Sequence, residues 1–284
     1  MSPLPGNPAA GERGRPATPG QQVAWLLSSP RVCVGVWTGA TRTPCPAGTP
    51  VPPGTDAQCA GCAAADRGRA LARDAILGGD DRDWHLYLAW FGSGLLKVGL
   101  TAEDRGDDRL LEQGAIAWTL LAGGRYAAIR RAEQTVSAAG LARERIGARA
   151  KADAWWVLPG AGERAEHVEK AHAAVTAAVT WPAGVTPTGC NVHDAATVYG
   201  LDEPPPAAYQ ELTGVDDAAV LAGRIRAAVG RRLLIDTPAG PLLADMRRIA
   251  GLPLAAAAGD ARPAGLHSTS RMRPHPHGND QRLF

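Results

Sequence analysis

The sequence predicts an α+β fold, in which a small antiparallel three-stranded sheet with flanking helices occupies the middle of the chain. A cysteine-containing β segment precedes this core, and a small C-terminal β unit follows it. The prediction rests on short runs of alternating apolar residues, glycine-rich turns between them, and longer Ala-rich stretches with helical spacing. The chain has 284 residues, 45% of them hydrophobic, so it can bury one large core or several smaller ones.

Composition divides the chain into six segments. Both ends are rich in Pro, Gly and small residues and lack an apolar period, which is typical of disordered tails. The prolines at 204–206 mark a further boundary. The predicted segments are an N-terminal tail at 1–22, a cysteine-containing segment at 23–80, an α/β core at 83–150, a helical extension at 151–203, a β unit at 204–259 and a disordered C-terminal tail at 260–284.

The core segment has the order strand, strand, helix, strand, helix. The first two strands are joined by Gly92, Ser93 and Gly94, which are typical hairpin residues. Asp107 or Asp108 can cap the first helix. The expected elements are strands at 84–91 and 95–100, a helix at 109–113, a strand at 115–121 and a helix at about 125–141.

The flanking segments have simpler patterns. A helix is expected at about 163–179. Residues 219–256 alternate short apolar runs around a turn at 237–240, which predicts a small antiparallel β unit or barrel fragment.

Charge and hydropathy restrict the location of the protein. The formal net charge of +2 neither requires nor excludes a polyanionic partner. No run approaches the roughly 20 apolar residues that cross a bilayer, and residues 1–22 lack an apolar signal core. We therefore expect a soluble cytoplasmic protein without a membrane partner. The sequence leaves its oligomeric state open.

Four of the five cysteines form a metal-ligand pattern. Cys33, Cys45 and Cys59 are followed by Cys62, which completes a Cys-x-x-Cys pair. Two such thiolates can grip one Zn²⁺, and two more complete a closed tetrahedral structural site. In a reducing compartment this explains the cysteines better than disulfides do. The alternative is a set of scattered buried thiols.

The core strands resemble the GIY-YIG nuclease superfamily. His85-Leu86-Tyr87, nine intervening residues and Lys97-Val98-Gly99 look like its paired strands, with Lys97 in place of the second tyrosine. The helix-borne arginine of the superfamily resembles Arg109, with Arg105 as a rival, and its metal-binding glutamate resembles Glu133. The order of these motifs after a cysteine cluster is also similar to a bacterial family whose domain has no assigned function.

The resemblance implies a GIY-YIG-like fold and a metal-dependent endonuclease, or a degenerate descendant of one. Tyr87, Arg109 and Glu133 would be catalytic, and Glu133 would bind Mg²⁺ or Mn²⁺. Phosphodiester hydrolysis requires a deprotonatable oxygen, a fixed cation and a metal-binding carboxylate. The alternative is a non-catalytic zinc-containing module that binds nucleic acid or protein, which the replacement at Lys97 favours. A third hypothesis is a structural adaptor that binds through the C-terminal β unit.

Helical spacing gives an independent view of Glu133. Ile129, Glu133, Val136 and Gly140 share one face of the expected helix. A carboxylate in an apolar stripe pays a desolvation cost unless a cation meets it. A metal ligand meets this condition, and so does an edge residue or a salt bridge to Arg109.

Basic residues favour DNA or RNA as the partner. The stretch from Arg125 to Lys151 contains seven basic residues and only two acidic ones, and such a stretch could follow a phosphate backbone. An ordinary solvated helix face is the alternative. The expected nucleic-acid contacts are Lys97, Arg105, Arg125, Arg130 and Arg131.

Overall fold

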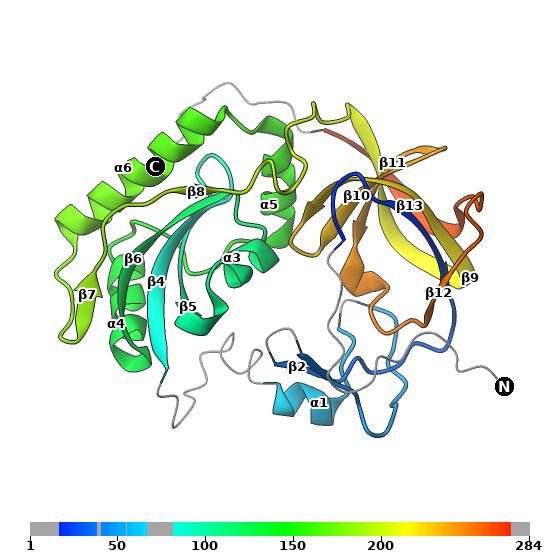
Figure 1. Cartoon of the computed structure of the whole chain (residues 1–284), viewed down its shortest axis with the longest axis horizontal. Coiled ribbons are helices and arrows are strands. Elements are labelled where there is room, and N and C mark those ends of the chain that lie inside the picture. Colours follow the sequence, from blue (N-terminus) through cyan, green and yellow to red (C-terminus); the bar gives the residue numbers. More distant parts are fainter. Residues whose placement is uncertain (1–16, 39–40, 55, 67–81, 274–284) are drawn as a thin grey trace. The chain divides into compact units, whose positions relative to one another are not determined.

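Strands from both ends of the chain meet in one sheet of the computed structural model, which describes residues 17–38, 41–54, 56–66 and 82–273. The chain forms two compact units (Figure 1). Unit 1 contains residues 1–80 and 208–271, and unit 2 contains residues 81–207 and 272–284. The division differs from the six consecutive segments that composition suggests.

Unit 1 is a six-stranded sheet, and the part of the chain that carries the four cysteines follows its first strand. Its core contains Leu27, Leu221, Ile225 and Ile235, all at most 1% exposed. Its elements are β1 (Gln22–Leu27), β2 (Val36–Thr38), β3 (Thr41–Thr43), α1 (Ala60–Ala65), β9 (Ala208–Val229), β10 (Arg232–Thr237), β11 (Gly240–Asp245), a short 3₁₀ helix (Met246–Arg248), β12 (Leu254–Ala256) and β13 (Ala264–Met272).

The long strand β9 organises this sheet. Its C-terminal part pairs with both β1 and β10, while Gln210 and Glu211 near its start pair in parallel with β11. Because β10 also pairs with β11, the three strands β9, β10 and β11 close on one another. Strand β12 extends the sheet beyond β1, and β13 pairs with β9.

A buried arginine joins the cysteine-containing segment to this sheet. Arg31 is 7% exposed, and its guanidinium donates to the carbonyl oxygens of Ala250 at 2.7 Å, Pro52 at 2.5 Å and Arg247 at 3.0 Å. Burial lowers the pKa of Arg31, and the Asp56 carboxylate opposes this effect. Because a planar guanidinium can satisfy three carbonyl oxygens at once, Arg31 holds three chain segments together.

Unit 2 is an antiparallel sheet with the strand order β5, β4, β6, β7, and β8 also pairs with β6. Its elements are β4 (Asp83–Trp90), β5 (Leu96–Ala102), a 3₁₀ helix (Glu103–Arg105), α3 (Asp108–Gln113), β6 (Ala117–Arg125), α4 (Tyr126–Ala138), α5 (Ala148–Ala154), a second 3₁₀ helix (Trp155–Val157), α6 (Ala161–Ala178), β7 (Val185–Pro187) and β8 (His193–Asp194).

Helices cover both faces of the unit 2 sheet (Figure 1). Trp84 of β4 contacts Tyr126 of α4, and Trp90 of the same strand stacks on His167 of α6. Side chains alternate along a strand, so these even-numbered positions share one face. On the opposite face Tyr87 contacts Gln113 of α3.

The structure confirms an α+β fold but corrects several predictions. The three expected core strands are present, yet the sheet has five strands because β7 and β8, within the expected helical extension, pair with β6. The expected small β unit at 204–259 is part of a six-stranded sheet that also includes β1. Strand β13 occupies residues predicted as a tail, because β9 offers it a pairing edge. Residues 1–16 and 274–284 lie outside the described part.

Among the described residues, no helix combines the length and the apolar character that crossing a membrane requires.

The contacts of Arg31 predict that this side chain stabilises the folded state. We expect Arg31→Lys to lower the free energy of unfolding by about 2–4 kcal/mol, because a lysine ammonium cannot reach all three carbonyl oxygens and leaves buried acceptors unpaired. Chemical denaturation would measure the change. Arg262→Lys, at an exposed position, is the matched control and should have almost no effect. Equal stability of the two variants would contradict this role for Arg31.

Candidate functional site

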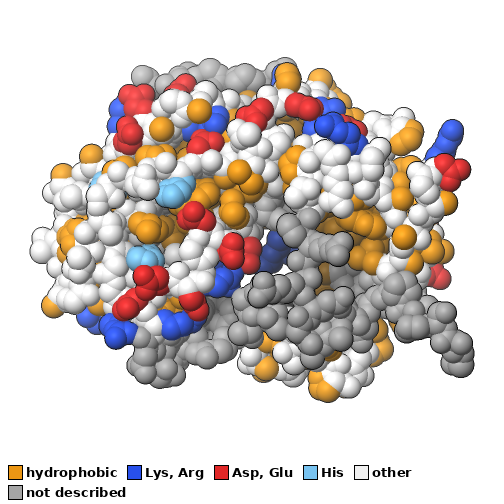
Figure 2. All heavy atoms as spheres, in the orientation of Figure 1, with side chains coloured by type: hydrophobic (Ala, Val, Ile, Leu, Met, Phe, Trp, Pro, Cys, Tyr) orange, Lys and Arg blue, Asp and Glu red, His pale blue; other side chains and the backbone are white. Residues whose placement is uncertain are grey.

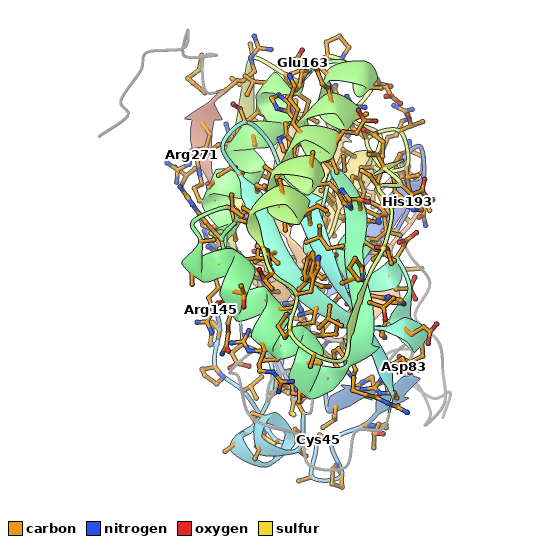
Figure 3. All side chains as sticks on the ribbon, turned by 90° about the vertical axis from the view of Figure 1, so that its left-hand side faces the viewer. Cys45, Asp83, Arg145, Glu163, His193 and Arg271 are labelled. Atoms are coloured by element: carbon orange, nitrogen blue, oxygen red, sulfur yellow. The ribbon has the colours of Figure 1, made fainter. Side chains whose placement is uncertain are left out.

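Four cysteines of unit 1 meet at one point. The Sγ atoms of Cys33, Cys45, Cys59 and Cys62 all lie within 4.8 Å of one another, and those of Cys45 and Cys59 are 3.9 Å apart. Tetrahedral zinc with Zn–S bonds of about 2.3 Å requires sulfur separations of about 3.8 Å. Cys45 lies near α1 in Figure 3. The cluster could therefore hold a metal ion such as zinc.

The backbone around the cluster is arranged for a sulfur site. Gly35 N–H donates to Cys33 Sγ at 3.4 Å, and Cys59 N–H donates to the same sulfur at 3.2 Å. Gly35 has a φ of +76°, and a Cβ there would collide with the Thr43 carbonyl oxygen. Glycine at position 35 thus permits the tight turn that follows Cys33.

Cys45, Cys59 and Cys62 have shifted pKa values. A hydrogen bond from the Thr49 backbone N–H lowers the pKa of Cys45 to about 6. A hydrogen bond from the Cys62 backbone likewise lowers the pKa of Cys59. Burial, together with the neighbouring cysteine side chains, raises the pKa of Cys62 to about 12. A bound divalent cation would compensate the repulsion that opposes ionisation of the fourth thiol.

The Tyr87 hydroxyl of unit 2 lies between two donors. Lys97 Nζ donates to Tyr87 Oη at 3.2 Å and to the Val98 carbonyl oxygen at 3.1 Å, and Gln113 Nε2 donates to Tyr87 Oη at 2.7 Å. Gly99 is directly opposite Tyr87 in the β4–β5 pairing, and a Cβ on Gly99 would overlap with Tyr87 Oη and Lys97 Nζ. The missing side chain of Gly99 makes room for this contact.

Glu133 is the buried carboxylate on helix α4. It is 4% exposed and forms an ion pair with Arg130, which also contacts Glu144 at 3.3 Å. Burial raises the pKa of Glu133, while the positive charges of Arg130 and Lys97 oppose this shift. The alternative prediction, a salt bridge between Glu133 and Arg109, is wrong. The partner of Glu133 is Arg130, which lies one helical turn away on α4.

The two candidate arginines near α3 differ in their surroundings. Arg105 pairs with Glu112 at 2.7 Å, whereas no ion pair of Arg109 occurs among the described residues. Arg109 is partly exposed and lies four residues before Gln113, so the two share one face of α3. Of the two rivals, Arg109 is thus on the helix face that contacts Tyr87.

The predicted nucleic-acid contacts are dispersed. Lys97 points to Tyr87, Arg130 pairs with Glu133, and Arg125 is 3.6 Å from Asp83 in an exposed pair. Arg131 is exposed on α4. On the face of unit 2 that Figure 2 shows, acidic and basic side chains are interspersed.

Sequence reasoning missed two polar neighbours. Gln113 could have been found from its spacing of four residues after Arg109, which places both on one helix face. Glu144 has no such signal, because it contacts Arg130 from a segment that follows α4, and only the folded chain brings them together.

The fold and the cysteine cluster define an α+β protein with a site that could hold a metal ion. The chain belongs to the DUF2797 family, described as proteins of unknown function, because residues 75–254 match the model of that family. The match spans β4 to β11 and leaves the four cysteines outside it. No curated protein and no solved structure matches the chain. Membership of a family without an assigned function is thus confirmed, whereas the GIY-YIG resemblance stays a prediction.

The cysteine geometry predicts one zinc ion per chain. In protein without an affinity tag, elemental analysis should find zinc at a ratio of about one, and Cys59→Ser should lose it and unfold at a lower temperature. Cys190→Ser, at an exposed free cysteine, is the control and should keep the metal. Zinc that stays unchanged in Cys59→Ser would rule out this site.

Proposed function

We propose that unit 2 is a metal-dependent nucleic-acid phosphodiesterase of the GIY-YIG type, or a degenerate descendant of one. The proposal rests on the contacts of Lys97. Its Nζ donates a hydrogen bond to Tyr87 Oη, and its positive charge opposes the rise in the pKa of Glu133. Tyr87, Lys97 and Glu133 come from β4, β5 and α4, in the chain order that the resemblance implies.

Each of these side chains suits one requirement of phosphodiester hydrolysis. Tyr87 Oη receives a hydrogen bond from the Lys97 ammonium, which would stabilise the deprotonated oxygen. That oxygen could then accept a proton from the attacking water. Arg109, on the face of α3 that contacts Tyr87, can offset charge on the phosphate. DNA or RNA would be the substrate.

Glu133 is the residue that would hold Mg²⁺ or Mn²⁺. A buried carboxylate needs a cation nearby, and Arg130 provides one. The Glu133 carboxylate fits a divalent cation if the Arg130 guanidinium moves away from it. When bound, the metal would supply charge stabilisation for the scissile phosphate.

A second candidate function is a non-catalytic module that binds nucleic acid or protein. Two observations favour it. Tyr87 is only 1% exposed, and Arg130 already neutralises Glu133, so both groups can also be explained as packing and a buried ion pair. Exposed basic residues such as Arg131 and Arg143 would then contact a phosphate backbone without cleavage.

Glu133→Gln tests the first candidate. Cleavage of DNA or RNA with Mg²⁺ or Mn²⁺ should fall at least about 100-fold, because the amide cannot anchor the metal. Binding of uncleaved nucleic acid should persist, as measured by fluorescence anisotropy at several salt concentrations. Glu169→Gln, at an exposed position on α6, is the control and should cleave like the wild type. If the wild type cleaves no nucleic acid with either metal, the non-catalytic module is favoured.

Glu133→Gln should also change how the stability of the folded state depends on pH. Because burial raises the pKa of Glu133, the native state binds this proton more tightly than the unfolded chain does. The protonated Glu133 side chain therefore contributes to the stability of the folded state. This contribution is complete below the ordinary pKa near 4.5, and it is lost as the pH rises through the higher pKa of the native state. Thermal unfolding between about pH 4 and 7 should show a weaker decline for Glu133→Gln than for the wild type. An identical decline would mean that Glu133 has an ordinary pKa.

A further inference from the structure

We propose that Gln113 is a positioning residue for Tyr87, and that Lys151 holds Gln113 in place. This inference rests on the proposed function, because it explains how the Tyr87 hydroxyl is oriented for proton transfer.

The hydrogen bonds of Tyr87 Oη determine the direction of its own proton. A phenol oxygen has one O–H donor and two acceptor positions. Gln113 Nε2 at 2.7 Å and Lys97 Nζ at 3.2 Å occupy both acceptor positions. The phenolic hydrogen must therefore point in the third direction around the oxygen, which neither Gln113 nor Lys97 occupies. Once that hydrogen has passed to a base in solution, both donors still contact the oxygen, so the site needs no rearrangement to stabilise the negative charge. The phenolate oxygen can then take a proton from the attacking water.

The end of α3 places Gln113 at this oxygen. Gln113 is the last residue of the helix, and Gly114 ends it in the left-handed conformation with a φ of +70°. Carbonyl oxygens in the last turn of a helix lack partners within the helix. Lys151 Nζ, from α5, donates to the Gln113 carbonyl oxygen at 3.0 Å and lies 3.6 Å from the centre of the Phe91 ring. Lys151 thus anchors the backbone of the residue whose side chain reaches Tyr87.

The same helix connects two of the proposed catalytic groups. Arg109 lies one turn before Gln113 on α3, so a shift of this helix would move both side chains relative to β4. Helix α3 has only six residues, so its position depends on its contacts with neighbouring parts of the chain. The Gln113 contact with Tyr87 therefore also fixes where α3 presents Arg109.

The test compares Gln113→Met, which keeps the length of the side chain and removes the donor, with Gln113→His, which keeps a donor. Steady-state cleavage with Mg²⁺ should show a kcat about 10-fold lower for the methionine variant at unchanged KM, and partial recovery for the histidine variant. The unfolding temperature should stay near that of the wild type. Gln134→Met, at an exposed position on α4, is the matched control and should have the wild-type kcat.

A double-mutant cycle separates positioning from general structural damage. In a Tyr87→Phe background, which lacks the hydroxyl, Gln113→Met should cause no further loss of kcat. Lys151→Met should lower kcat less than Gln113→Met does, and this loss should also vanish with Tyr87→Phe.

The outcomes distinguish the two proposals. A wild type that cleaves, together with an unaffected Gln113→Met variant, would overturn the inference and leave the proposed function standing. An equal loss in both backgrounds would overturn it as well. A wild type that cleaves nothing would overturn the proposed function, and the positioning role with it.

Discussion

Tyr87 faces a residue without a side chain, and the candidate site of unit 2 depends on this. The antiparallel register of β4 and β5 places Gly99 opposite Tyr87, and the space that a Cβ would fill admits Tyr87 Oη and Lys97 Nζ instead. With this space available, a donor from β5 and a second donor from α3 reach one oxygen. A larger residue at position 99 would have to displace the tyrosine or the lysine, and the polar contacts would be lost with them.

Both candidate sites gather groups that carry negative charge when ionised, and such charge needs a compensating cation. Glu133 is buried on α4, and Arg130 from the same helix supplies the compensating charge. The four cysteines bring their sulfurs within 4.8 Å of one another, and a metal ion would supply the compensation there. The first site can thus be stable without a metal, because its cation belongs to the chain. This difference explains why Glu133 fits either a catalytic or a purely structural role, whereas the cysteine cluster points to a metal more directly.

Unit 1 is assembled from distant parts of the chain. Strand β1 precedes the four cysteines, yet it pairs with β9, about 200 residues later along the chain. Arg31 then fastens the cysteine-containing segment to carbonyl oxygens of Ala250 and Arg247. These contacts make the cysteine-containing segment part of the same unit as the C-terminal sheet, although the family match begins after the cysteines.

Local patterns in the sequence determined the α+β class, the three core strands and the set of four cysteines. Alternation, glycine turns and ligand spacing act over a few residues, so they can be read without the fold. The tertiary structure decided the number of strands, because β7, β8 and β13 pair with edges that come from elsewhere in the chain. It also decided that Glu133 pairs with Arg130, and that Gln113 and Lys97 share Tyr87 Oη. These contacts depend on side-chain direction and strand register, which residue spacing alone does not specify.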